Sequence, residues 1–161
     1  MKIGLAIRDV RDAETELAEE LGRIGECHRA DHDVYHLSRT LASLHRSNLE
    51  TLAPFGERYG ITVDPTNAEP AGGLLARARE KASELSGRRP EGALLLLSDL
   101  RHLHLLYAEA SVNWVLLAQG AQAIRDAELL QAVTRCHPET LRGMKWTLTR
   151  LKTAAPQVLA G

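Results

Sequence analysis

The sequence predicts an all-α protein that folds as an antiparallel four-helix bundle in a single domain covering residues 1–161. Three observations lead to this fold class. The length suits one domain. Hydrophobic residues make up 44% of the chain, and leucine and alanine dominate them, which favours helices because both lose little conformational freedom there. Finally, no run of β-branched and aromatic residues alternates over the length of a strand.

The first half of the chain carries a seven-residue apolar repeat. Val10, Leu17 and Ile24 recur at this spacing, which is typical of a helix that buries one face. One helix over residues 8–56 would be roughly 75 Å long at 1.5 Å per residue. Because that is too long for a compact domain of this size, the chain has to reverse.

The polar segment 28–33 is the place where we expect this reversal. Asp31 or Asp33 can cap the next helix with a side-chain oxygen. We therefore predict helices over about 8–29 and 32–58. No glycine or proline marks the break, so the alternative that 28–33 continues a helix stays open.

Glycines and prolines divide the second half of the chain. Gly56 and Gly60 are expected to stop the second helix, and Pro138 to restart the chain near its end. The predicted elements are a loop at about 60–73, a short helix at about 74–85, a helix at about 91–119, and a two-part C-terminal section at about 126–136 and 138–154.

This order of elements is typical of a four-helix bundle with an extra short crossover helix. The alternative is a helical hairpin that completes its core by dimerising. Both arrangements leave exposed helix faces, so we expect a homo-oligomer, with a dimer as the first expectation.

Charge and composition argue against several function classes. The 20 Lys and Arg balance 21 Asp and Glu without a basic tail, which does not favour nucleic-acid binding. The most apolar run, 93–97, is far shorter than the roughly 20 residues that cross a bilayer. Neither a signal peptide nor a CxxC motif occurs, so we expect a cytoplasmic protein without a zinc ribbon.

Several histidines have spacings that matter for metal binding. His28, His32 and His36 lie at i, i+4 and i+8, which places them on one face of a continuous helix and suits metal chelation. The predicted turn passes through this stretch, and a solvated polar turn is then the simpler interpretation. His102 and His104 are two residues apart and face different directions on a helix.

Polar residues also interrupt the apolar stripe. Asp31, Ser38 and His45 follow the same seven-residue series as Val10. Buried polar groups need partners, so the series indicates either a polar or metal site inside the bundle, or a capping role for Asp31 with His45 paired near the surface.

Three carboxylates lie near apolar helix faces. Glu109 stands among leucines and Trp114, Glu14 lies between Ala13 and Leu17, and Glu139 lies near the expected start of the last helix. There a carboxylate also complements the helix dipole, and Glu14 could equally point to solvent.

Longer motifs resemble ferritin-like bundles. The segments are Asp12-Ala13-Glu14 with Leu17 and Leu21, Leu52 to Phe55, Glu109 to Trp114, Ala118 to Gly120, Ala127 to Leu130, and Cys136 to Glu139. Their order resembles the two helical pairs of the small stress-response branch of that superfamily. The resemblance implies Glu14, Glu109 and Glu139 as metal ligands.

The chain departs from the di-iron ligand pattern, which uses a Glu from each of two helices and a Glu-x-x-His from each of the others. Arg142 follows Glu139 where a His is required, and it can pair with a carboxylate instead. Glu50 is followed by Ala53, and Asn113 stands where a Tyr is often found.

The sequence leads to three hypotheses. In the first, the protein is a ferritin-like bundle that has neither an intact di-iron centre nor a cofactor, and it acts in binding or assembly. The alternative is a divergent oxidase or storage protein that binds iron or manganese through Glu14, His45, Glu109 and Glu139, with His28 as a further ligand. The third is a small-molecule pocket lined by Tyr35, Leu41, Tyr107 and Trp114.

Overall fold

The computed structural model describes residues 2–66 and 92–160, and within these ranges it contains four helices and no strand. The helices are α1 (Ile3–Cys27), α2 (His32–Arg58), α4 (Gly92–Ala123) and α5 (Ala127–Ala160). The prediction of an all-α protein is confirmed for these residues. The expected helix at 74–85 and the later part of the loop at 60–73 lie outside them.

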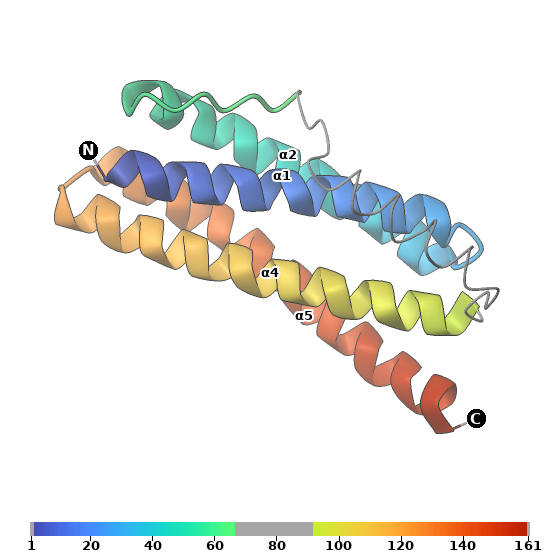
Figure 1. Ribbon diagram of the computed structural model, residues 1–161. Coiled ribbons are helices and arrows are strands. Elements are labelled where there is room, and N and C mark those ends of the chain that lie inside the picture. The colour runs from blue at the N-terminus through green and yellow to red at the C-terminus, as the bar shows by residue number, and fades with distance from the viewer. Residues whose placement is uncertain (1, 67–91, 161) are drawn as a thin grey trace.

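The helices are arranged as two pairs. α1 lies beside α2, and α4 lies beside α5 (Figure 1). The pairs join chiefly through α1 and α4, while α5 contacts α2 over a shorter stretch. The end of α5 extends past the other helices (Figure 1). No described helix has the length and hydropathy needed to span a bilayer.

The turn between α1 and α2 confirms the predicted break. Asp31 caps α2, because its Oδ1 accepts a hydrogen bond from the Val34 amide at 3.1 Å. Its other oxygen accepts from Arg150 Nη2 at 2.6 Å, which ties the turn to α5. α1 begins at Ile3 rather than near residue 8, because both Ile3 and Ile7 are buried in the core.

The end of α2 depends on two glycines with different roles. Gly60 has a φ of +74°, and the Ile61 amide donates to the Gly56 carbonyl at 2.8 Å, which makes a Schellman-type cap. Gly56 does not stop the helix, contrary to expectation. It lies inside α2, where the chain after the cap crosses so closely that a Cβ would be 2.5 Å from the Ile61 carbonyl oxygen.

The predicted division of the C-terminal section is wrong, because α5 continues through Pro138. Proline removes one helical hydrogen bond, but Pro138 is exposed, where water can solvate the freed carbonyl. Buried Cys136 and Thr140 on either side hold both parts against the core. Packing therefore outweighs the local preference.

The core consists of two apolar clusters, one toward each end of the bundle. The first includes Ile7, Val10, Leu117 and Leu129, and the second includes Leu17, Leu21, Leu41 and Leu103. On α1, Val10 belongs to one cluster and Leu17 to the other, with Glu14 between them. A polar layer therefore separates the clusters.

Gly56→Ala should destabilise the protein by about 1–3 kcal/mol, because the new methyl group would overlap backbone that cannot move without disrupting the cap. Gly22→Ala on α1 is the matched control. It meets nothing within 4 Å and should stabilise the helix by up to about 1 kcal/mol. Urea denaturation of both variants measures the difference, and equal effects would contradict the close approach at Gly56.

Candidate functional site

Glu14 of α1 is completely buried and lies at the centre of the polar layer. One carboxylate oxygen accepts hydrogen bonds from His45 Nδ1 at 2.7 Å and from Asn48 Nδ2 at 3.0 Å. The other accepts from Trp114 Nε1 at 2.7 Å and from Thr140 Oγ1 at 3.2 Å. The donors come from α2, α4 and α5, so all four described helices meet at this carboxylate.

The network extends through His45 to Tyr107. His45 is also completely buried, and its Nε2 lies 2.9 Å from the Tyr107 hydroxyl. Because a carboxylate only accepts, Nδ1 of His45 carries a proton. A neutral ring accepts a hydrogen bond from the Tyr107 hydroxyl at Nε2, and a protonated ring donates to that hydroxyl, so Nε2 has a partner in both states.

Gly143 on α5 makes room for this arrangement. A Cβ at position 143 would overlap the ring and hydroxyl of Tyr107. The tyrosine hydroxyl therefore reaches His45 only because α5 has no side chain at this position. Burial, followed by the nearby charge of Glu14, raises the pKa of Tyr107, so its hydroxyl keeps its proton.

The carboxylate of Glu14 is held in its charged form. Burial raises its pKa, but hydrogen bonds from His45, Trp114 and Asn48, together with the attraction of His45, outweigh burial and lower the pKa below the ordinary value. The site is therefore a buried carboxylate whose charge is stabilised by fixed donors.

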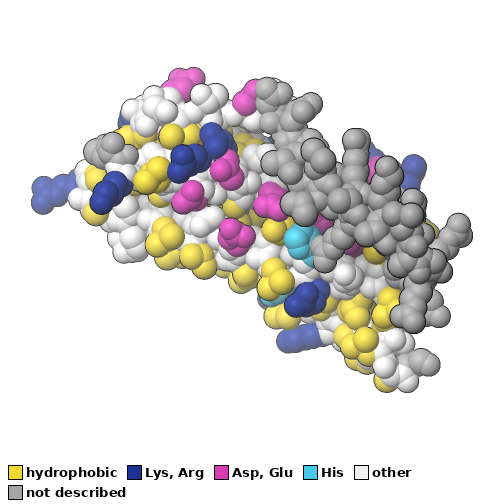
Figure 2. Space-filling model, viewed as in Figure 1, with side chains coloured by type: hydrophobic (Ala, Val, Ile, Leu, Met, Phe, Trp, Pro, Cys, Tyr) yellow, Lys and Arg dark blue, Asp and Glu magenta, His cyan; other side chains and the backbone are white. Residues whose placement is uncertain are grey.

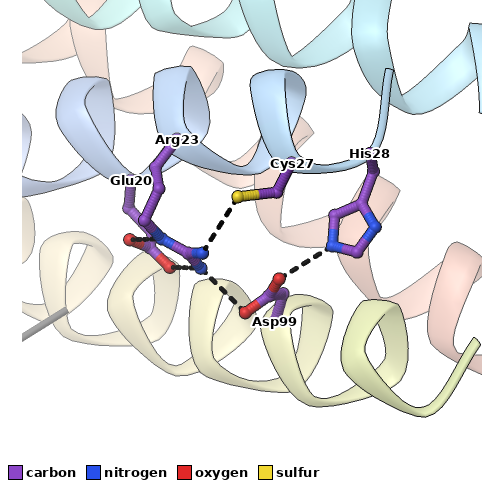
Figure 3. Close-up of polar contacts among 5 residues, drawn as sticks. All are labelled: Glu20, Arg23, Cys27, His28 and Asp99. Atoms are coloured by element: carbon purple, nitrogen blue, oxygen red, sulfur yellow. Dashed lines mark hydrogen bonds and ion pairs between the residues drawn. The ribbon is translucent and has the colours of Figure 1, made fainter. Parts of the chain in front are cut away.

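A second polar network joins the end of α1 to α4 (Figure 3). Arg23 donates to Glu20 on its own helix at 2.6 Å and to Asp99 on α4 at 2.7 Å. His28 Nε2 donates to the other oxygen of Asp99 at 2.8 Å. Burial opposes the charge of Asp99, but His28 and Arg23 lower its pKa. This network fixes the α1–α2 turn against α4, and Cys27 lies at its edge, 3.7 Å from Arg23 Nη1.

The five predicted ligands do not gather at one point. Glu14 and His45 meet, but His28 is engaged with Asp99, and Glu109 is exposed on α4. Glu139 lies within α5 and forms an ion pair with Arg142 at 3.2 Å, as the sequence suggested for this arginine. Among residues 2–66 and 92–160, no three His, Cys, Asp or Glu side chains form a group that could hold a metal ion.

The residues of the expected small-molecule pocket also have other environments. Leu41, Tyr107 and Trp114 are buried in the core, and Tyr35 lies on the surface of α2, where Arg39 donates to its hydroxyl at 2.6 Å. Two shallow hollows of about 270 Å³ each lie at the end of the bundle where α1 begins and α4 turns into α5. Ala121 lines one of them and Gly120 lines the other. Neither reaches the polar layer.

Sequence reasoning found part of the network and missed the rest. His45 stood out because it interrupts an apolar series, and the structure buries it rather than placing it near the surface. Asn48 and Thr140 as donors to Glu14, and Asp99 as the partner of His28, were not predicted. Asp99 had one signal, as a lone acid within the apolar stretch Leu94 to Leu100.

Within residues 2–66 and 92–160, the fold and the site together define four packed helices with a buried carboxylate between two apolar clusters, and each oxygen of this carboxylate accepts two hydrogen bonds. No protein-family model, curated protein or solved structure matches this chain.

Glu14→Gln should lower the free energy of unfolding at neutral pH by about 2–4 kcal/mol, because an amide nitrogen would then face donors that need an acceptor. Glu14 has a lowered pKa in the folded state, so its stabilisation is complete above its ordinary pKa of 4.5 and is lost as the pH falls through the lower folded value. Urea denaturation of both proteins at neutral pH and in steps below pH 4.5 measures this effect. The difference in the free energy of unfolding between wild type and Glu14→Gln should become smaller as the pH falls.

Glu50→Gln is the control for this measurement, because Glu50 is exposed on α2. It should change the stability by no more than about 0.5 kcal/mol. If the difference in the free energy of unfolding between wild type and Glu14→Gln stays constant down to the lowest pH measured, Glu14 is not charged in the folded protein.

Proposed function

We propose that this protein is a ferritin-like helical bundle that acts as an assembly module, forms a homodimer in the cytoplasm, and has no redox metal centre. The observation that carries this proposal is the outer surface of α4, where large apolar side chains are exposed along a line. The polar layer contributes by holding the helix that presents this surface.

The order and packing of the helices support the ferritin-like, antiparallel arrangement. Short turns at 28–31 and 124–126 join the members of each pair, while a long connection, 59–91, separates the pairs. In Figure 1 the chain reverses direction at each short turn. One long crossover between two hairpins is the connectivity of ferritin-like bundles.

The chemistry of the donor set argues against a di-iron centre of the usual kind. Both oxygens of Glu14 already accept two hydrogen bonds each from protein groups. A metal would have to displace these donors and leave the indole of Trp114 buried without an acceptor, which is costly. Glu109 and Glu139 do not approach Glu14 closely enough to share an ion with it.

The outer surface of α4 has the properties of an interface. Leu105, Val112 and Leu116 are 53%, 58% and 57% exposed, and their spacing of seven and four residues places them on one side of the helix. Val115 flanks them and is 46% exposed. We call these four residues the α4 face. Glu109 is also exposed and lies between Leu105 and Val112, toward α1. Large exposed apolar side chains grouped on one side of a helix mark association sites, and a two-fold dimer is the commonest closed assembly.

Val112→Glu should convert the dimer to monomer, because two carboxylates would be buried in an apolar contact. Sedimentation velocity measures the change, and the helical circular dichroism signal should be retained, since position 112 makes no core contact. Ser43→Glu, on the exposed surface of α2, is the matched control and should remain dimeric. A monomeric wild-type protein at micromolar concentration would overturn the proposal.

The absence of a redox centre is tested by adding Fe²⁺, Mn²⁺ or Zn²⁺ to protein purified without air. We expect no change in the melting temperature, because only a ligand that binds the native state raises it. A rise that disappears in Glu14→Gln or His45→Ala would favour the divergent metal-binding protein instead.

A further inference from the structure

The α4 face lies between two edges of opposite charge. α1, on one side, carries seven carboxylates and three arginines, and α5, on the other, carries five Lys and Arg and two carboxylates. Figure 2 shows hydrophobic side chains along α4 and carboxylates gathered over α1 and the adjoining part of α4. These counts cover whole helices and include the buried Glu14, Arg23 paired with Glu20 and Asp99, and Arg150 paired with Asp31. The charge that each edge presents therefore depends on its exposed residues.

The acidic edge consists of Asp9 and Glu16 on α1 with Glu109 on α4, all exposed. Asn113 of α4 donates to the Asp9 carbonyl at 3.3 Å, which places this part of α1 directly beside α4. Although Glu16 is exposed, neighbouring atoms remove part of its carboxylate from water, and this desolvation, followed by the repulsion of Glu109, raises its pKa, with a smaller opposing effect of His102. Like charges thus crowd one another along this edge, and an approaching cation would relieve them.

The basic edge lies on α5. Leu141, Lys145, Leu148 and Lys152 follow one another at intervals of four, three and four residues, and all are exposed. Such spacing places them on one side of the helix. Neighbouring residues face α4, since His104 of α4 makes a hydrogen bond of 2.8 Å to Thr147. Leu141 and Leu148 therefore continue the apolar surface of α4, and the two lysines border it.

A two-fold contact between two α4 faces has two possible orientations. If the two-fold axis is perpendicular to α4 in the plane of the contact, the two α4 helices are antiparallel. The acidic edge of one copy then faces the acidic edge of the other, and the basic edges face each other. If the axis runs along the helices, α4 meets α4 parallel, and the acidic edge of each copy faces the basic edge of the other. Opposed like charges disfavour the first orientation, and opposite charges favour the second.

We propose that two copies of this chain associate through their α4 faces with the α4 helices parallel, so that Glu16 and Glu109 of each copy lie level with Lys145 of the other. Asp9 and Lys152 extend the acidic and basic edges in opposite directions along the helices. This inference rests on the proposed dimer and gives its geometry. The apolar face supplies the contact, and the charged edges select the orientation.

Disulfide cross-linking tests the orientation directly. In a background in which the exposed Cys27 is replaced by serine, Leu105→Cys and Leu116→Cys should each form covalent dimers on mild oxidation, because a parallel pair brings every position on the seam to its own copy. The two positions are about 16 Å apart along the helix, so an antiparallel pair could bring at most one of them within reach of its copy. Ser43→Cys on α2 is the control and should stay uncross-linked.

Charge reversal gives a second readout. Glu16→Lys/Glu109→Lys and Lys145→Glu/Lys152→Glu should each raise the dimer dissociation constant about tenfold or more, because like charges would then be opposed. Combining all four changes in one chain should restore the wild-type value, since opposite charges again meet. Glu50→Lys/Glu57→Lys changes the net charge equally on α2 and should leave the constant unchanged.

The outcomes separate the two proposals. A wild-type dimer that cross-links at only one of positions 105 and 116, or at neither, overturns the parallel geometry and leaves the assembly role intact. The same conclusion follows if the fourfold charge reversal fails to restore association. A wild-type protein that is monomeric in sedimentation overturns both proposals.

Discussion

The buried carboxylate of Glu14 is the constraint on which the arrangement of the helices depends. A charge removed from water destabilises a fold by several kcal/mol unless hydrogen bonds replace the lost solvent. Here His45, Asn48, Trp114 and Thr140 supply four donors from the three other described helices. Sliding any one helix by a turn of about 5.4 Å would remove its donor, whereas purely apolar faces would tolerate the shift. The polar layer therefore selects one register.

The same constraint explains features that look unrelated in the sequence. Tyr107 must enter the core to give His45 a partner, and its ring needs the space that Gly143 leaves on α5. The layer also divides the apolar core into two clusters. At the end of the second cluster, Arg23, His28 and Asp99 make a smaller network that satisfies an acid on α4 in the same way. These two networks match their polar groups between helices, whereas the buried hydroxyl of Ser38 on α2 has no hydrogen-bond partner among the described residues.

Sequence reasoning succeeded where a signal is local and failed where it depends on neighbours in space. The Asp31 cap and the role of Gly60 could be predicted because capping and left-handed conformations need particular residue types. Pro138 misled the prediction, since packing on both sides keeps α5 continuous. Glu14 and His45 were suspected from their position in apolar stripes, but a stripe does not reveal partners. Thr140, 126 residues away from Glu14, gave no local signal of its role.

α4 differs from the other helices in being apolar on two sides. Its inner side carries Tyr107 and Trp114, which serve the polar layer and the core, and its outer side carries Leu105, Val112 and Leu116. A helix that is hydrophobic around most of its circumference is normally buried in the middle of an assembly. α1 and α5 cover its two flanks and leave the outer side open. A second copy placed there would surround α4 with protein, which gives the helix the environment that its composition requires.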